Sequence, residues 1–213
     1  MLWENDSARG EMMKNMIAAV VCALLLVVAP AAAQPADAQK DRAAAAKYLE
    51  ETRQAFLKSI ENVTPAQWTF KASPTSWSIA EVAEHIGLSE GTIFGMITTQ
   101  MLQAPAKKAG EGIPDEKVIA GLTDRSSKFQ APEMLKPVNK WATKDALVED
   151  FNAARDKTIA WTKTTTEDLR AHAAPHPAFG PLDVHQWILL LAGHSARHTA
   201  QIEEVKTAAG YPK

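Results

Sequence analysis

The chain has 213 residues, enough for one domain with a hydrophobic core and a short appendage. Apolar residues make up 46% of it, which is ordinary for a globular protein. Its 23 Lys and Arg residues against 25 Asp and Glu residues produce no strong field of either sign, which excludes nucleic acid and anionic membranes as default partners.

Residues 1–33 have the pattern of a secretory signal peptide. Lys14 precedes an apolar run over 16–29, and Ala31-Ala32-Ala33 then supplies a small-residue cleavage motif. The run is shorter than the ~20 residues of a membrane-spanning helix, although a retained N-terminal anchor is the alternative. The first eleven residues are acidic, which is atypical of a signal, and the alternative starts are Met12, Met13 and Met16. We therefore expect an exported protein, periplasmic or secreted, with no stable membrane insertion after cleavage.

The single cysteine, Cys22, lies inside the apolar run and leaves with the signal. The mature domain, residues 34–213, then has no disulfide and no thiolate. Its chemistry must come from histidine, carboxylate or hydroxyl groups.

Two helical patterns occupy the first half of this domain. The first covers about 36–61, and Thr64-Pro65-Ala66-Gln67 then predicts a short helix start. The second begins at Ser78, where Glu81 three residues later completes a capping box, and continues to about residue 103. Its apolar stripe includes His85.

Residues 104–142 form a long connection interrupted by proline and glycine, with a short helical turn expected at 118–122. A connection of this length is usually a functional loop or a lid. The third helix is expected from Thr143 to about 164, and the fourth from Asp183 to near Gly210.

No β-alternation is found, and the segment 172–182 is predicted to be a loop. Four amphipathic helices in a domain of this size predict an all-α fold. The expected architecture is an up-down four-helix bundle with a long connection between helices 2 and 3.

His194 and His198 lie four residues apart on the apolar stripe of the fourth helix. Residues at this spacing share one helix face with Cβ atoms about 6 Å apart, so two imidazoles can bind one ion. His85, on the core face of another helix, is the expected third ligand, and three protein ligands leave a position for water. Histidines packed without metal are the alternative. The H-E-x-x-H motif of zinc proteases is absent, because Ser195 stands where its glutamate would be.

Two blocks of sequence resemble the DinB-like superfamily of four-helix-bundle metal proteins. The first is TPAQW at 64–68 with SWSIAEVAEHI at 76–86, and the second is GPLD at 180–183 with HSARHTAQI at 194–202. The resemblance covers about 40–211 and implies a divalent metal ion, zinc or nickel, bound by His85, His194 and His198. It also favours a homodimer. The export signal and the long connection depart from the family pattern.

Known activities in this superfamily include metal-dependent hydrolysis, thiol-dependent S-transfer and isomerisation, and many members have no assigned activity. The resemblance implies a metal-dependent hydrolase or transferase that acts on a small molecule through a metal-bound water. Export disfavours an S-transferase, since low-molecular-weight thiols are mainly cytoplasmic. The alternative is a non-catalytic metal-binding or stress-associated bundle.

Other polar and aromatic residues are weaker candidates for the site. Gln201 is either a hydrogen-bond partner of a metal ligand or a surface group, and Glu81 is assigned to its helix cap. His176 and Trp141 are candidates for the mouth or lid of the site, with a merely exposed position as the alternative. His172 and His185 are weaker candidates for a functional role than His176. We expect Glu84 and Glu203 to be solvated, and Arg197 to face solvent or to be paired. Trp77 and Trp187 are expected in the core.

Overall fold

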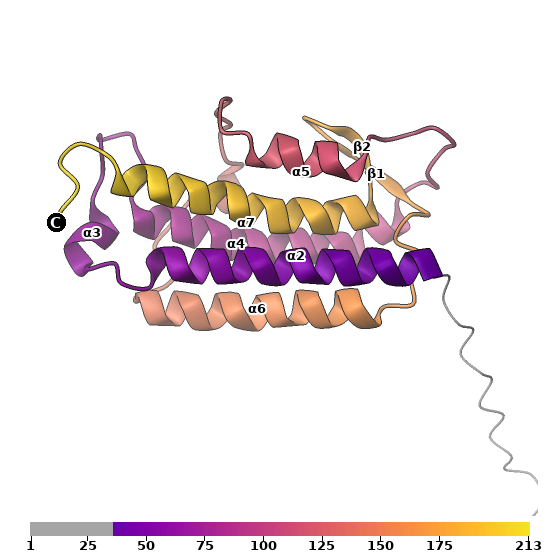
Figure 1. Cartoon of the computed structure of the whole chain (residues 1–213), viewed down its shortest axis with the longest axis horizontal. Helices are drawn as coiled ribbons and strands as arrows, with labels where there is room; N and C mark the ends of the chain where they lie inside the picture. Colours follow the sequence, from indigo (N-terminus) through magenta and orange to yellow (C-terminus); the bar gives the residue numbers. More distant parts are fainter. Residues whose placement is uncertain (1–35) are drawn as a thin grey trace, which may run out of the picture. The chain divides into compact units, whose positions relative to one another are not determined.

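The structure is a computed structural model that describes residues 36–213, so the predicted signal peptide lies outside the described residues. Four long helices form a bundle: α2 (Ala36–Ile60), α4 (Ile79–Thr99), α6 (Lys144–Thr164) and α7 (Val184–Lys206) (Figure 1). A short helix, α3 (Pro65–Thr69), joins the first two. The prediction of an all-α four-helix bundle is confirmed.

The helices begin where side chains satisfy their first backbone N–H groups. At α4 the Ser78 hydroxyl accepts from the Glu81 amide, and the Glu81 carboxylate accepts from the Ser78 amide. Asp183 and Gln186 form the same box at α7, and Thr143 caps α6. Because each pair lies three residues apart in sequence, these starts were readable from the sequence and are confirmed.

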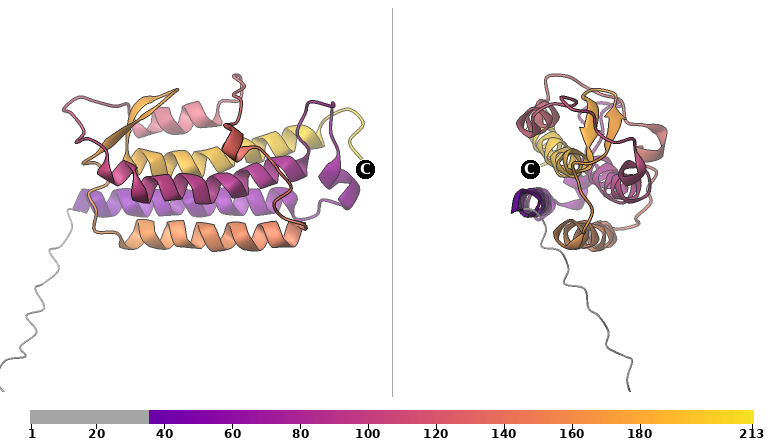
Figure 2. Two further views of the ribbon diagram at one scale, coloured as in Figure 1. Left: turned by 180° about the vertical axis from the view of Figure 1, so that it is seen from behind. Right: turned by 90° about the vertical axis from the view of Figure 1, so that its right-hand side faces the viewer.

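Helix order around the bundle differs from a simple meander. Helix α2 packs on α6 and α7, and α4 packs on the same two helices, so α2 and α4 lie diagonally opposite. Glu90 contacts Arg155, and Phe94 contacts Trp161. These contacts run in the same order along both helices, so α4 and α6 are parallel neighbours. Direction therefore does not alternate from α4 to α6, and the expected up-down order was wrong at this step, because the long connection brings the chain back along the bundle (Figure 2).

That connection contains three short helices, η1 (Met101–Gln103), α5 (Asp115–Thr123) and η2 (Glu133–Leu135). Helix α5 extends the predicted turn at 118–122 and packs on α7 through the buried Val118 and Leu122. Residues 124–140, here called the strap, then run from α7 across to α4 (Figure 2).

The expectation of a plain loop before α7 was wrong. Strands β1 (Ala173–His176) and β2 (Gly180–Asp183) pair antiparallel as a small hairpin. Four residues are too few to display alternation, and Pro175 faces Pro181 in the register, so the sequence carries little β signal there. Gly180 has a φ of 72°, a left-handed conformation that glycine adopts without strain.

The interior consists of two apolar clusters with polar residues between them. One cluster includes Leu49 and Ile97, and the other includes Phe56, which packs edge-on against Phe151 at 4.9 Å between ring centroids. Buried polar residues lie between the two clusters along every long helix: Thr52, Glu90, Arg155 and Ser195. This middle layer contains the candidate site. None of the helices in residues 36–213 combines the length and apolar character that crossing a membrane requires.

Candidate metal centre

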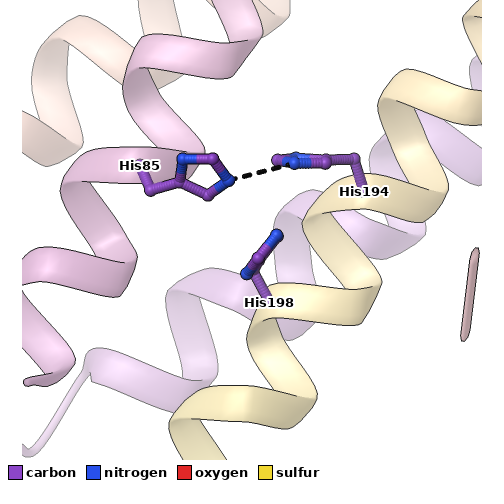
Figure 3. A group of neighbouring side chains, drawn as sticks. All are labelled: His85, His194 and His198. Atoms are coloured by element: carbon purple, nitrogen blue, oxygen red, sulfur yellow. Dashed lines mark hydrogen bonds between the residues drawn. The ribbon is translucent and has the colours of Figure 1, made fainter. Parts of the chain in front are cut away.

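Three histidines converge between α4 and α7 in the middle layer of the bundle (Figure 3). His85 comes from α4, and His194 and His198 from successive turns of α7. One ring nitrogen from each lies within 4.8 Å of the other two, and the Nε2 atoms of His85 and His194 are 3.1 Å apart. The structure thus brings together the three residues that the sequence predicted as ligands.

Two of the three rings are held by hydrogen bonds at Nδ1. His85 Nδ1 donates to the Leu135 carbonyl oxygen at 2.7 Å, and His198 Nδ1 donates to Gln201 Oε1 at 2.8 Å. A carbonyl oxygen only accepts, so the proton lies on Nδ1 and the Nε2 lone pair is left for a ligand. Partners of this kind fix the tautomer and the orientation of metal-binding imidazoles.

His194 is the ring whose polar atoms are not satisfied by protein. Its Nδ1 is buried without a hydrogen-bond partner among the described residues. Its Nε2 faces His85 Nε2, which carries a lone pair because the proton of His85 is on Nδ1. A single proton can form a hydrogen bond between these two Nε2 atoms, but it leaves the Nε2 atom of the third ring unpaired. A metal ion can instead accept the lone pairs of all three rings at once. The donor set therefore fits a divalent metal ion.

Burial keeps these rings neutral. It lowers the pKa of His85, and the hydrogen bond to Leu135 opposes this only in part. Burial, followed by the charges of the other two histidines and of nearby arginines, puts the pKa of His194 well below its usual range. Burial and the charge of His85 lower the pKa of His198 to about 3. Near pH 7 all three imidazoles are in the neutral form that binds metals.

Two charged residues beside the predicted ligands are buried, which makes the prediction for Glu84 wrong and leaves for Arg197 the alternative of a paired side chain. Glu84 is 5% exposed, and its carboxylate accepts from three strap amides, those of Val138, Asn139 and Lys140. Arg197 is 8% exposed and donates to carbonyl oxygens of residues 122, 124 and 127. Their hydrogen-bond partners lie more than 50 residues away in the chain, so no local sequence pattern could predict that these two side chains are buried. Glu203 is exposed, as predicted.

Other predictions near the site have mixed outcomes. Gln201 is a partner of a ligand, Glu81 serves the helix cap, and Trp187 lies in the core. Trp77 is only partly buried, with its ring centroid 5.1 Å from that of His85. Trp141 packs over Gly87 and donates to an Asp150 carboxylate oxygen on the α6 side, so it is no lid over the histidines.

The remaining histidines lie outside the cluster. His176 belongs to the hairpin and stacks on Phe179, with the Trp187 ring beside it. His172 Nδ1 contacts the Ala104 carbonyl oxygen at 2.6 Å, and His185 is buried with Nε2 3.4 Å from Asp115. His176 is therefore a half-buried residue of the hairpin, neither at the mouth of the histidine cluster nor merely exposed.

A buried ion pair that the sequence reasoning did not anticipate lies directly beside the histidines. Arg155 of α6 donates to both carboxylate oxygens of Glu90, at 2.8 and 2.7 Å, and to the Ser195 hydroxyl, next to His194. A signal was present, because Glu90 lies four residues after Ile86 and Arg155 four after Phe151, on apolar helix faces. Opposite charges on two buried faces indicate a buried pair.

Comparison with known proteins places the chain in a family. A family model described as the DinB superfamily matches residues 48–202. YuaE of Bacillus subtilis, an uncharacterized protein, is 27% identical over 158 residues, which cover 74% of this chain and 94% of that protein. A tRNA pseudouridine synthase A of Haloarcula marismortui is 31% identical over 137 residues, 54% of this chain and 48% of that protein. The chain therefore spans only about half of that enzyme.

A solved structure shares the fold. YfiT of Bacillus subtilis, described as a probable metal-dependent hydrolase with an unusual four-helix bundle topology, superposes with a TM-score of 0.53 and 19% identity. The match covers 80% of this chain and 89% of that one. At this identity the likeness concerns the fold alone. The family match over most of the described residues is decisive: this chain belongs to the DinB superfamily.

Proposed function

We propose that the chain binds one divalent metal ion, zinc or nickel, through His85, His194 and His198 and acts as a metal-dependent hydrolase on a small molecule. The observation that carries the proposal is the convergence of three neutral imidazoles whose free nitrogens lie within 4.8 Å of one another. Three-histidine sites that keep a further position open are typical of catalytic rather than structural zinc.

When bound at such a site, the ion supplies Lewis acidity and lowers the pKa of water toward ~7. The protein keeps the three imidazole rings neutral, because they are buried. The Leu135 carbonyl oxygen orients the ring of His85, and the Gln201 amide oxygen orients that of His198.

The protein groups beside the cluster argue against a carboxylate nucleophile. Glu84 is occupied by three strap amides, and both oxygens of Glu90 accept from Arg155. Hydrolysis with water as the nucleophile is therefore the reaction that suits this site best. The description of YfiT, which shares the fold, as a probable metal-dependent hydrolase supports the same reaction class.

The first test is metal content by ICP mass spectrometry on the full chain, produced without a His-tag. We expect about one zinc or nickel ion per chain in the wild type and almost none in His85→Ala or in His194→Ala/His198→Ala. A wild type that takes up no metal even after reconstitution would remove the proposed mechanism.

The second test is turnover of ester, amide and phosphoester model substrates by the metal-loaded protein. Metal-dependent hydrolysis that disappears in His85→Ala supports the proposal. A loaded protein that hydrolyses none of these substrates would favour the alternative, a metal-binding bundle without catalysis.

We also propose that the chain is exported, on the strength of the signal pattern in residues 1–33. N-terminal sequencing of the protein from the producing cell checks this. A mature terminus at Gln34 is the expected result, and a product that keeps the 16–29 segment would contradict it.

A further inference from the structure

The strap, residues 124–140, is tied to the bundle by residues that adjoin the metal ligands in sequence. Arg197 directly precedes His198 on α7, and Glu84 directly precedes His85 on α4. The strap passes from one of these helices to the other across the side on which the histidines meet.

The first anchor lies at the start of the strap. The Arg197 guanidinium donates to the carbonyl oxygens of Leu122, Asp124 and Ser127, and it lies 5.3 Å from the centroid of the Phe129 ring. A planar guanidinium can bind several carbonyls in a fixed geometry, which the single ammonium of a lysine cannot do. This anchor therefore sets the direction in which the strap leaves α5.

The second anchor lies at the far end of the strap. Glu84 Oε1 accepts from the amides of Val138 and Lys140, and Oε2 accepts from the amide of Asn139. The left-handed φ of 58° at Asn139 helps to turn three successive amides toward one carboxylate. Hydrogen bonds from N–H groups to a charged carboxylate are about twice as strong as neutral ones.

Between the two anchors the strap reaches a ligand directly. The Leu135 carbonyl oxygen, at the end of η2, accepts the proton on His85 Nδ1 at 2.7 Å. Leu135 is 8% exposed, so its side chain is also packed in place. Displacement of the strap would remove the acceptor that fixes the tautomer of His85.

We infer that Glu84 and Arg197 are positioning residues, which hold the strap so that the Leu135 carbonyl orients His85 for the metal. The inference rests on the proposed metal site. Neither residue contacts the ion, yet the affinity for metal depends on both. Loss of an orienting partner of this kind typically weakens metal binding by about 10- to 100-fold.

Coupling of this sort is reciprocal. If the seated strap favours metal binding, metal binding favours the seated strap by the same factor. The amides of residues 138–140 should therefore exchange with solvent more slowly when the ion is bound, and this readout needs no substitution.

The test compares zinc affinity and amide exchange in the full chain. Glu84→Gln and Arg197→Lys should each weaken zinc binding by about tenfold or more, measured by competition with a chromophoric chelator. The matched controls are Glu81→Gln, which keeps its capping box, and Arg53→Lys, whose partners Glu50 and Asp156 lie on α2 and α6, the two long helices that supply none of the three histidines. Both controls should bind zinc within twofold of the wild type.

Exchange measurements keep the inference testable if a variant folds poorly. In the wild type, zinc should slow exchange at Val138, Asn139 and Lys140 but not at solvent-exposed amides elsewhere. Unchanged zinc affinity in Glu84→Gln and Arg197→Lys, or unchanged exchange at 138–140 on zinc addition, would overturn the inference while leaving the metal site intact. A wild type that binds no zinc would instead overturn the proposed function itself.

Discussion

Two buried polar clusters lie next to each other in the middle layer of this bundle, and they differ in how fully their polar atoms are satisfied. His194 belongs to the histidine cluster, and the next residue, Ser195, belongs to the Arg155 network. In that network the five N–H groups of one guanidinium meet five acceptors, on Leu49, Thr52, Glu90 and Ser195.

The histidine cluster is satisfied only in part. His194 Nδ1 has no partner among the described residues, and two Nε2 atoms approach each other at 3.1 Å. Buried polar groups without partners cost free energy, so they persist where another function maintains them. The complete network therefore joins the four helices, whereas the incomplete one leaves ring nitrogens that a bound ligand would satisfy.

The largest expected effect concerns the complete network. Arg155→Met removes the counter-charge of Glu90, which is fully buried, and should lower the free energy of unfolding by about 3–5 kcal/mol. Urea unfolding measures this. The double variant Arg155→Met/Glu90→Leu should lose clearly less, since no charge is left buried. A single variant as stable as the wild type would show that Glu90 is not charged or not enclosed.

The next effect separates the two clusters. With zinc at a thousandfold excess over its dissociation constant, the wild type should gain about 4 kcal/mol of stability relative to the protein in EDTA. His194→Ala/His198→Ala should lose this gain, because the ligands are missing. Thr199→Ala, on the same helix, serves as the control and should keep it. Thermal unfolding with and without zinc would decide, and a zinc response that survives in the double variant would contradict the assignment of the ligands.

A smaller effect is expected at the partner of His198. Gln201→Ala removes the acceptor at 2.8 Å from Nδ1 and should weaken zinc binding by about tenfold. Stability without metal should change little, because Gln201 is partly exposed. Gln201→Glu keeps an acceptor at this position and should retain the affinity. Equal affinities in the wild type and in Gln201→Ala would exclude a role in orienting His198.

The smallest effect tests a third polar cluster, at the end of the bundle where α7 begins. Burial would raise the pKa of Asp115, but hydrogen bonds from Arg170 and Gln186 outweigh it and hold the pKa below its usual value of 3.8. Because the folded pKa is depressed, the stabilisation is present above about pH 3.8 and is lost as the pH falls further.

We expect this contribution to be about 1 kcal/mol, since the Asp115 side chain is 27% exposed and solvent screens the pair. The free energy of unfolding of the wild type, followed from pH 5 to pH 2, should fall more than that of Asp115→Asn. Parallel curves for the two proteins would mean that Asp115 contributes nothing to the acid sensitivity.

Much of this fold was predictable because its signals are local. A capping box joins residues three apart, and the pair His194 and His198 shares one helix face by helical geometry alone. The four long helices were therefore predicted correctly, and the structure brings the three predicted ligands together. The hairpin at 173–183 was not, because strands of four residues that contain paired prolines show no alternation.

By itself, the sequence determined the helix starts, the apolar faces and the placement of His194 and His198 on one helix face, because each depends on residues within about one turn of one another. Only the tertiary structure decided what the charged neighbours of the predicted ligands do. Glu84 meets amides 54 to 56 positions away, and Arg155 meets Glu90 across 65 positions. Such partners are chosen by helix order, which the strap and the rest of the long connection set, and no pattern along one helix encodes which other helix will lie against it.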